Sequence, residues 1–349
     1  MLIADRYKLV GPTAGGGMGD ITQCVDTHLD RRVVLKSLQP GVEHGRLLDE
    51  QRALTQLRSK HVVQLFDIVE LPNNGQKALV LEYIDGADLA FAGYQADRKF
   101  VHILWQIACG LRDVHAANVI HRDLKPNNIR IDTEGVVKIF DFGLARSVGL
   151  DNKTRSIIGT PVFMAPELWG ETTISFSTAI DVYAFGVTAI ALLSGTMPPA
   201  LLARPPLPVA RSNVEEILEG LPTDLVTQVA RCLEIDPSNR PKMADVAAIL
   251  ERHLLYQRHR AIAVINSEAK TLDTTSKNIV MKVGPDKSMT IQYNGDDFLV
   301  SEVQGAVFIN NSGATVGKII PGCCVITFGI HGEQRTFVTF DIANPEVMA

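Results

Sequence analysis

Several features are scarce or missing in this chain of 349 residues. Its five cysteines, of which Cys323 and Cys324 are adjacent, show neither the spacing of metal ligands nor a paired framework, which suits a reducing cytosol. A formal net charge of -5 gives no general attraction to nucleic acid or to an anionic membrane. The longest apolar run, near 182–193, is shorter than the roughly 18 to 20 residues of a membrane span and favours a buried helix.

The N-terminal segment MLIADRYKLV has an acid and a base early and no apolar core, so we do not interpret it as a signal peptide. No fixed-period repeat or low-complexity segment is found. With 46% hydrophobic and 21% charged residues, the composition is that of a globular protein, and the length favours two domains. We therefore predict a cytoplasmic protein that has neither nucleic acid nor a membrane among its partners.

Three styles of sequence follow one another along the chain. Short apolar runs broken by turn signals come first, then a part dominated by the helical period, then short β-branched runs broken by Gly, Asn or Asp. The fold class predicted from this order is α+β. Its parts are a sheet-rich lobe over about 1–82, a helical lobe over about 86–255, a helical or polar linker over 256–277, and a small β-domain over 278–349, for which a β-sandwich is favoured.

The segment IHRDLKPNNI, residues 120–129, concentrates charged and amide side chains between apolar ones. A polar turn between two buried strands would explain the amides and the proline. It would not explain why Asp123 and Lys125 stand two residues apart beside apolar anchors. We therefore favour a site that handles a charged substrate.

Three further motifs are weak signals when each is taken alone. The glycines of AGGGMGDI, residues 14–21, let a backbone approach phosphate oxygens, although a flexible surface loop would look the same. Lys36 ends the apolar run VVLK and would ordinarily be an edge residue, but Glu50 on the next helical stretch could pair with it. Asp141 opens DFGLAR after an apolar run, where it could simply be a turn acid.

Taken in order, these motifs resemble the signature set of protein kinases, of the bacterial eukaryotic-like serine/threonine type. The resemblance begins at residue 7 and implies a two-lobed protein kinase domain over 1–255. It extends to the family's structural positions, which in this sequence are Arg122, Thr160, Glu167, Asp181 and Arg240. In this family the arginine at position 240 pairs with the glutamate at position 167.

The resemblance implies ATP and Mg²⁺ as cofactors. Lys36 is expected to hold the α- and β-phosphates and to be aligned by Glu50. Asn128 and Asp141 are expected to bind Mg²⁺, a hard cation that prefers oxygen donors. The residues expected around the nucleotide are Ala14, Gly15, Gly16, Gly17, Met18, Gly19, Ile21, Val34, Lys36, Leu81, Glu82 and Ile84.

The acceptor is also implied by the resemblance. Asp123 is expected to orient the acceptor hydroxyl and take its proton, and Lys125 to contact the transferring phosphate. The lysine of HRDLKPNN and Thr160 of GTPVFMAPE resemble the serine/threonine kinases. Protein serines and threonines, including those of the chain itself, are therefore the expected substrates.

Three residues depart from the family pattern. Ala14 replaces the first glycine of the Gly-rich loop, and Pro12 removes a backbone donor from the expected strand. Val34 replaces the usual alanine over the nucleotide base. Its two additional methyl groups are expected to weaken or reshape nucleotide binding.

Regulation is expected in the loop between Asp141 and Glu167. Arg122 precedes the catalytic acid, as in kinases controlled by phosphorylation of this loop. Thr154 and Ser156 are the candidate phosphosites, because a phosphate there would pair with Arg122 and order the loop. The alternative is that hydroxyls are simply common in polar loops. Phosphorylation between two copies would require a transient homodimer.

The β-domain permits two interpretations. Residues 305–329 weakly resemble the final strands of a forkhead-associated domain, which binds phosphothreonine in partner proteins. Against this, Gly284 is followed by Pro285 and not by arginine, and the nearest cations, Lys318 and Arg335, suit solvated strand faces. A degenerate domain used for docking or autoinhibition is the alternative.

Two other functions stay open for the whole chain. One is a pseudokinase scaffold, and the other is an ATP-gated binding module that acts through the β-domain. The intact catalytic and metal-binding side chains argue against the scaffold, whereas Ala14 and Val34 argue weakly for it.

Overall fold

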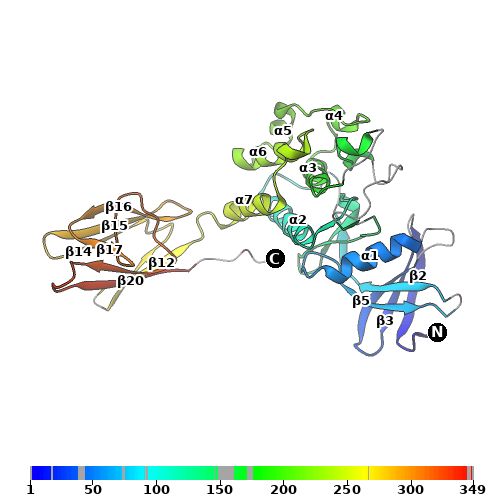
Figure 1. Cartoon of the computed structure of the whole chain (residues 1–349), viewed down its shortest axis with the longest axis horizontal. Coiled ribbons are helices and arrows are strands. Elements are labelled where there is room, and N and C mark those ends of the chain that lie inside the picture. The colour runs from blue at the N-terminus through cyan, green and yellow to red at the C-terminus, as the bar shows by residue number, and fades with distance from the viewer. Residues whose placement is uncertain are drawn as a thin grey trace. The chain divides into compact units, whose positions relative to one another are not determined.

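The chain forms two compact units, residues 1–250 and residues 251–348 (Figure 1). The structure is a computed structural model that describes residues 2–16, 19–37, 44–72, 75–89, 91, 93–144, 146–147, 161–170, 176–265, 267–343 and 347. Within these ranges, no helix is both long and apolar enough to cross a membrane.

The first unit begins with an antiparallel six-stranded sheet in the order β1-β2-β3-β4-β6-β5 (Figure 1). Its strands are β1 (Leu2–Ile3), β2 (Tyr7–Gly16), β3 (Gly19–Asp26), β4 (Arg31–Ser37), β5 (Leu65–Glu70) and β6 (Lys77–Glu82). Helix α1 (His44–Gln56) lies beside β5 and buries Leu47 and Leu54. This sheet and helix form the predicted sheet-rich lobe.

The pairing of β2 with β3 is irregular near Pro12. Leu9 pairs with Cys24 and Thr13 with Thr22, so that three residues of β2 face one residue of β3. Pro12 lies in this bulge, where a residue without a backbone N–H leaves no gap in the hydrogen-bond ladder.

Helices dominate the rest of the first unit, as the sequence predicts. They are α2 (Arg98–Ala116), α3 (Ala179–Leu193), α4 (Pro199–Leu202), α5 (Arg211–Ile217), α6 (Thr223–Cys232) and α7 (Met243–Leu255). The Asp97 side chain caps α2 by accepting a hydrogen bond from the amide of Phe100 at 2.9 Å. Every residue of α3 from Ile180 to Leu192 is buried, which confirms the buried helix expected from its apolar run.

Short elements connect these helices. The strands are β7 (Gly86–Asp88), β8 (Val119–Ile120), β9 (Ile129–Asp132), β10 (Val137–Ile139) and β11 (Arg146–Ser147), and the 3-10 helices are η1 (Pro126–Asn128), η2 (Pro161–Phe163), η3 (Pro166–Trp169) and η4 (Pro237–Asn239). Strands β7, β9 and β10 form one small sheet and β8 and β11 another.

The second unit contains two antiparallel sheets that share one hydrophobic core (Figure 1). The six-stranded sheet has the order β13-β12-β20-β19-β17-β18, and the three-stranded sheet has the order β14-β15-β16. Phe298 of the smaller sheet stacks on Tyr293, with ring centroids 4.7 Å apart, and meets Phe340 of the larger sheet edge-on at 5.9 Å. This confirms a small β-domain, built as two facing sheets. Its strands are β12 (Arg260–Ile265), β13 (Glu268–Leu272), β14 (Asn278–Val283), β15 (Lys287–Tyr293), β16 (Phe298–Gln304), β17 (Val307–Ile309), β18 (Ser312–Gly313), β19 (Cys323–Phe328) and β20 (Thr336–Ala343).

The structure differs from the predicted linker over 256–277. Strands β12 and β13 lie there and pair as a hairpin whose turn includes Ser267 at φ +67°. Ala261 and Ala263 carry the buried face of β12. Alanine has low strand propensity, so the alternation of these alanines with exposed residues does not predict a strand. The boundary between the two units also lies within α7 and not after it.

Asp26 is a fully buried carboxylate at the end of β3. Arg6 donates to both of its oxygens at 2.7 Å, and Arg31 and the amide of His28 donate at 3.4 Å and 3.2 Å. The hydrogen bonds from Arg6 contribute most to lowering the pKa of Asp26 to about 2.

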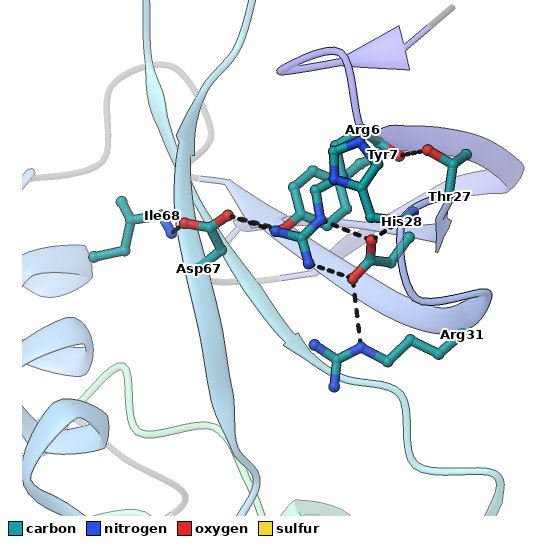
Figure 2. A network of polar contacts seen from close by, with 8 residues as sticks. Arg6, Tyr7, Thr27, His28, Arg31, Asp67 and Ile68 are labelled. Atoms are coloured by element: carbon teal, nitrogen blue, oxygen red, sulfur yellow. Dashed lines mark hydrogen bonds and ion pairs between the residues drawn. The ribbon is translucent and has the colours of Figure 1, made fainter.

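A second contact in this network curls the sheet. The hydroxyl of Tyr7 on β2 donates to Asp67 on β5 at 2.8 Å (Figure 2). Three strands separate β2 from β5 in the sheet order, so the sheet must bend to bring the two side chains together. Tyr7 is fully buried inside the bend, where it packs with Cys24 and Val33.

We predict that Asp26→Asn lowers the melting temperature of the first unit by roughly 3–6 °C at pH 7.5, because it leaves the buried donors around position 26 poorly matched. Tryptophan fluorescence follows this unit selectively, since both tryptophans, Trp105 and Trp169, lie in it.

The stabilisation depends on pH in a defined direction. Because the folded-state pKa of Asp26 is depressed to about 2, its contribution is complete above the ordinary carboxyl value near 4 and is lost as the pH falls toward 2. The difference between the two proteins should therefore stay constant from pH 8 to pH 5. The exposed Asp30→Asn serves as the control, and an equal effect there would contradict the prediction.

Candidate active site

A buried ammonium group joins three segments of the first unit. The Nζ atom of Lys36, on β4, lies 2.8 Å from the carboxylate of Glu50 on α1. The same atom lies 2.7 Å from Oδ1 of Asp141, which follows β10. The sequence could only suggest these partners, and the structure brings them together.

Electrostatics keeps Lys36 and Asp141 charged, whereas burial raises the pKa of Glu50. Burial alone would lower the pKa of Lys36, but the carboxylates of Glu50 and Asp141 raise it above its ordinary value. Burial alone would likewise raise the pKa of Asp141, but the charge of Lys36 lowers it. Lys36 is therefore a cation, and Asp141 an anion, at neutral pH.

The catalytic-loop residues predicted from IHRDLKPNNI surround one carboxylate. Lys125 Nζ lies 2.7 Å from Oδ2 of Asp123, and the side-chain amide of Asn128 donates to the same oxygen at 3.0 Å. The amide also donates to the backbone carbonyl of Asp123 at 2.8 Å. The loop thus orients its acid with two side chains from its own sequence.

Asp181, at the start of α3, fixes the catalytic loop through its backbone amides. Its carboxylate accepts hydrogen bonds from the backbone amides of His121 and Arg122 at 2.8 and 2.9 Å, and from the ring of His115 at 3.0 Å. Burial alone would raise the pKa of Asp181, but these donors, with His115 foremost, lower it. Arg122 has φ +73°, so the bonds to Asp181 fix a backbone turn that few residues adopt.

The two residues expected to bind metal lie on joined segments. The amide of Phe140, next to Asp141, donates to the backbone carbonyl of Asn128 at 3.0 Å. Asn128 uses its amide nitrogen for both contacts with Asp123, which leaves its side-chain oxygen for other partners. Oxygen donors from one carboxylate and one amide suit Mg²⁺, so these residues fit the expected cation.

The nucleotide pocket is described in part. Val34 pairs directly with Leu81 across β4 and β6, so the two side chains are neighbours on one face of the sheet. The side chain of Glu82 contacts Lys138 at 2.8 Å, and its backbone amide donates to the carbonyl of Gln64 at 2.9 Å. The Ile84 carbonyl accepts from Arg130 at 3.4 Å. Two residues further on, a Cβ at Gly86 would collide with β9, so glycine is required there.

The described part of the Gly-rich segment lies at the end of β2 and the start of β3. Ala14 pairs with Ile21, and Gly16 pairs with Gly19, so alanine at position 14 follows a strand path. Gly15 belongs to the same strand. The remaining predicted residues lie outside the described ones: Gly17, Met18, Thr154, Ser156 and Thr160.

Arg240 forms hydrogen bonds with several segments of the helical lobe. Its fully buried guanidinium donates to both carboxylate oxygens of Glu167 at 2.7 and 2.8 Å. It also donates to the backbone carbonyls of Ala179, Glu234 and Ile235 at 2.8 to 3.2 Å. One side chain therefore connects η3, α3 and the segment before η4.

The two lobes and this site define a protein kinase domain. A family model described as "Protein kinase domain" matches residues 7–250, and the chain belongs to that family. The chain is 33% identical to serine/threonine-protein kinase PknA of Mycobacterium tuberculosis over 69% of its own length and 58% of the relative's. It is 29% identical to "Probable serine/threonine-protein kinase pknA2" of Bifidobacterium longum, over 71% and 33%.

A eukaryotic relative is similar over the same part. Serine/threonine-protein kinase TOS3 of Saccharomyces cerevisiae is 28% identical over 70% of this chain and 52% of its own length. The chain thus spans between 33% and 58% of the length of these relatives. Protein kinases in general use ATP and Mg²⁺. The family and the two-lobed fold expected from the sequence motifs are confirmed.

Three contributing residues were not anticipated from the sequence. His115 contacts Asp181, Lys138 occupies the side chain of Glu82, and Phe176 stacks under the guanidinium of Arg122 at 3.8 Å. Each belongs to a segment far along the chain from its partner. No local spacing signals such pairs.

We predict that Arg240→Lys lowers the free energy of unfolding of the first unit by about 2–3 kcal/mol, because lysine cannot form the bidentate pair and leaves backbone carbonyls unbonded. Urea denaturation followed by tryptophan fluorescence measures the change. Arg231→Lys on the exposed side of α6 is the matched control. Equal midpoints for the two variants would show that the contacts of Arg240 contribute little.

Proposed function

We propose that this chain is a serine/threonine protein kinase, which transfers the γ-phosphate of ATP to serine and threonine hydroxyls of proteins, including its own. The observation that carries this proposal is the contact of Lys36 with both Glu50 and Asp141 at 2.7 to 2.8 Å. A lysine aligned this way presents a fixed positive charge beside the acid expected to bind metal. An inactive scaffold has no need for both contacts.

The proposed mechanism depends on positioning and on charge. Bound Mg²⁺ would neutralise charge on the transferring phosphate, with Asp141 and Asn128 as its ligands. Lys36 would hold the α- and β-phosphates, since Glu50 fixes the direction of its ammonium group. Lys125 would contact the transferring group from the catalytic loop.

Asp123 would orient the acceptor hydroxyl and accept its proton. Lys125 and Asn128 both contact Oδ2 of this carboxylate, which limits its rotation. Its main contribution would be to aim the hydroxyl, with proton transfer late in the reaction.

Specificity for serine and threonine is supported by Lys125 in HRDLKPNN. It is also supported by the similar proteins, which are named as serine/threonine-protein kinases. The cytoplasm, where ATP is abundant, is the proposed location. A pseudokinase scaffold is the second candidate function. It is favoured weakly by Ala14 and by Val34, whose neighbour across the sheet is Leu81 and whose side chain would narrow the proposed adenine pocket.

Regulation by phosphorylation is proposed to act through Arg122. Its guanidinium stacks 3.8 Å above the ring of Phe176 and donates to the carbonyl of Leu144 at 3.3 Å. A guanidinium can pair with a phosphate through several N–H donors at once. Thr154 and Ser156 are the proposed acceptors, and transfer between two copies would require a transient homodimer.

The β-domain is proposed as a docking or autoinhibitory module. Lys318 donates to the carbonyl of Gly313 at 3.2 Å, and the guanidinium of Arg335 lies 5.4 Å from the ring centroid of Phe337. Both cations therefore have partners within the domain, which favours docking over capture of a phosphothreonine on a phosphoprotein.

We predict that Asp123→Ala lowers phosphate transfer about 10²–10⁴-fold, because the acceptor hydroxyl loses its orienting carboxylate. The full chain is incubated with radiolabelled ATP and Mg²⁺, and the labelled residues are mapped. Glu134→Gln, an exposed change in the turn between β9 and β10, is the control. Label on Thr154 or Ser156 in the wild type, absent in Asp123→Ala, is the expected result. Folded wild-type protein that binds ATP without transferring label to any acceptor would favour the scaffold.

We predict that Val34→Ala tightens ATP binding about 3- to 10-fold, equivalent to about 1 kcal/mol, because it removes two methyl groups from the proposed adenine pocket. Titration calorimetry measures the dissociation constants. Val34→Ile, which adds a methylene group, should weaken binding. If neither change alters affinity, Val34 does not face the nucleotide.

A further inference from the structure

Phe91, on the segment between β7 and α2, is a large apolar side chain that is 50% exposed. Its ring meets that of Phe163 with centroids 6.2 Å apart and planes inclined by 60°. Phe163 is only 7% exposed, so it supports Phe91 from beneath. Burying an exposed phenyl ring is favourable, and one that is exposed and supported in this way is suited to contact a ligand.

The segment that carries Phe91 is fixed at both ends. The amide of Leu89 donates to the carbonyl of Ile129 at 3.0 Å, and Ile129 directly follows Asn128 of the catalytic loop. On the other side, the amide of Tyr94 donates to the carbonyl of Leu192 at 3.2 Å. Phe91 therefore lies within two residues of a strand contact to the catalytic loop.

Phe163, the partner of Phe91, lies in a different segment of the chain. It ends η2, which packs against α3, and it precedes Glu167, which is held by Arg240. The aromatic pair thus links the segment before α2 with the end of the segment that starts at Asp141. The catalytic loop, which contains Asp123, contacts both α3 and β7.

Many carboxylates in this region already contact a basic side chain, whereas Asp97, on the segment that leads into α2, accepts a hydrogen bond from the amide of Phe100. Asn127, the exposed residue of the catalytic loop, is a neutral amide. Six carboxylates, on residues 82–88, on the catalytic loop and on the segments that begin at Asp141 and Pro161, each contact a basic side chain. These pairs are Glu82–Lys138, Asp85–Arg32, Asp88–Arg130, Asp123–Lys125, Asp141–Lys36 and Glu167–Arg240. A basic side chain of a substrate would have to displace one of these partners.

We infer that Phe91, supported by Phe163, binds an apolar side chain of the protein substrate near the acceptor hydroxyl. The preferred substrates are then serines and threonines with a leucine-like residue at one nearby position, and not ones flanked there by arginine. This inference rests on the proposed kinase function. It concerns the same site and adds the class of substrate that the site selects.

The test uses the full chain with Mg²⁺, ATP and a set of synthetic peptides. Each peptide has one central threonine in a neutral background, and each of the four positions on either side is in turn Leu, Ala, Arg or Glu. We expect one position at which leucine raises kcat/KM about tenfold over alanine, with arginine no better than alanine. The gain should appear mainly in KM, since the contact is made in the bound ground state as well.

Two variants assign the preference to Phe91. In Phe91→Ala the ratio of leucine to alanine peptides should fall toward one, and in Phe91→Glu the arginine peptide should become the best at the same position. Leu29→Ala removes a comparably exposed apolar side chain from the turn between β3 and β4 and should leave the ratio unchanged. Melting curves establish that each variant is folded.

The outcomes separate the two proposals. Transfer to the peptides without any apolar preference, or a preference that survives in both Phe91 variants, overturns this inference and leaves the kinase function in place. No transfer to any peptide or to the chain itself overturns the proposed function, and this inference with it.

Discussion

The first unit depends on one ammonium group held between two carboxylates. Lys36 lies on β4, Glu50 on α1 and Asp141 after β10, so their contacts at 2.7 to 2.8 Å join the sheet, the helix and the helical lobe. A buried ammonium group is stable only when it is paired, and loss of a partner would leave Lys36 less well compensated. The contact therefore requires both lobes to be in place at once, which is the state needed for catalysis.

Buried charged side chains also hold the irregular backbone segments of the helical lobe in place. Backbone groups of the catalytic loop, of the start of α3 and of the segment before η4 bond to buried charged side chains. Asp181 accepts from two loop amides, and Arg240 donates to three carbonyls besides Glu167. Asp181 stands on α3, which is buried along almost its whole length. A rigid helix thereby sets the position of the loop that carries Asp123.

The β-domain is stabilised differently, by an apolar core between two sheets that includes Phe298 and Phe340. Its tight β17–β18 turn has Asn310 and Asn311 at φ +47° and +65°, values that suit a two-residue hairpin. The proposals divide the work accordingly. The first unit selects and modifies the acceptor, through Asp123 and Phe91, and the second provides a surface for docking.

The sequence by itself determined the succession of lobes and indicated the side chains that we propose for catalysis. Phosphate and metal chemistry admits few residue types, so Lys36, Asp123, Asn128 and Asp141 could be chosen from motifs alone. Tertiary structure decided the contacts that join distant segments, such as Phe91 with Phe163. It also decided the strands over 260–272, where buried alanines gave no strand signal. Such features arise from packing and burial, which depend on the whole folded chain and leave no mark at short spacing.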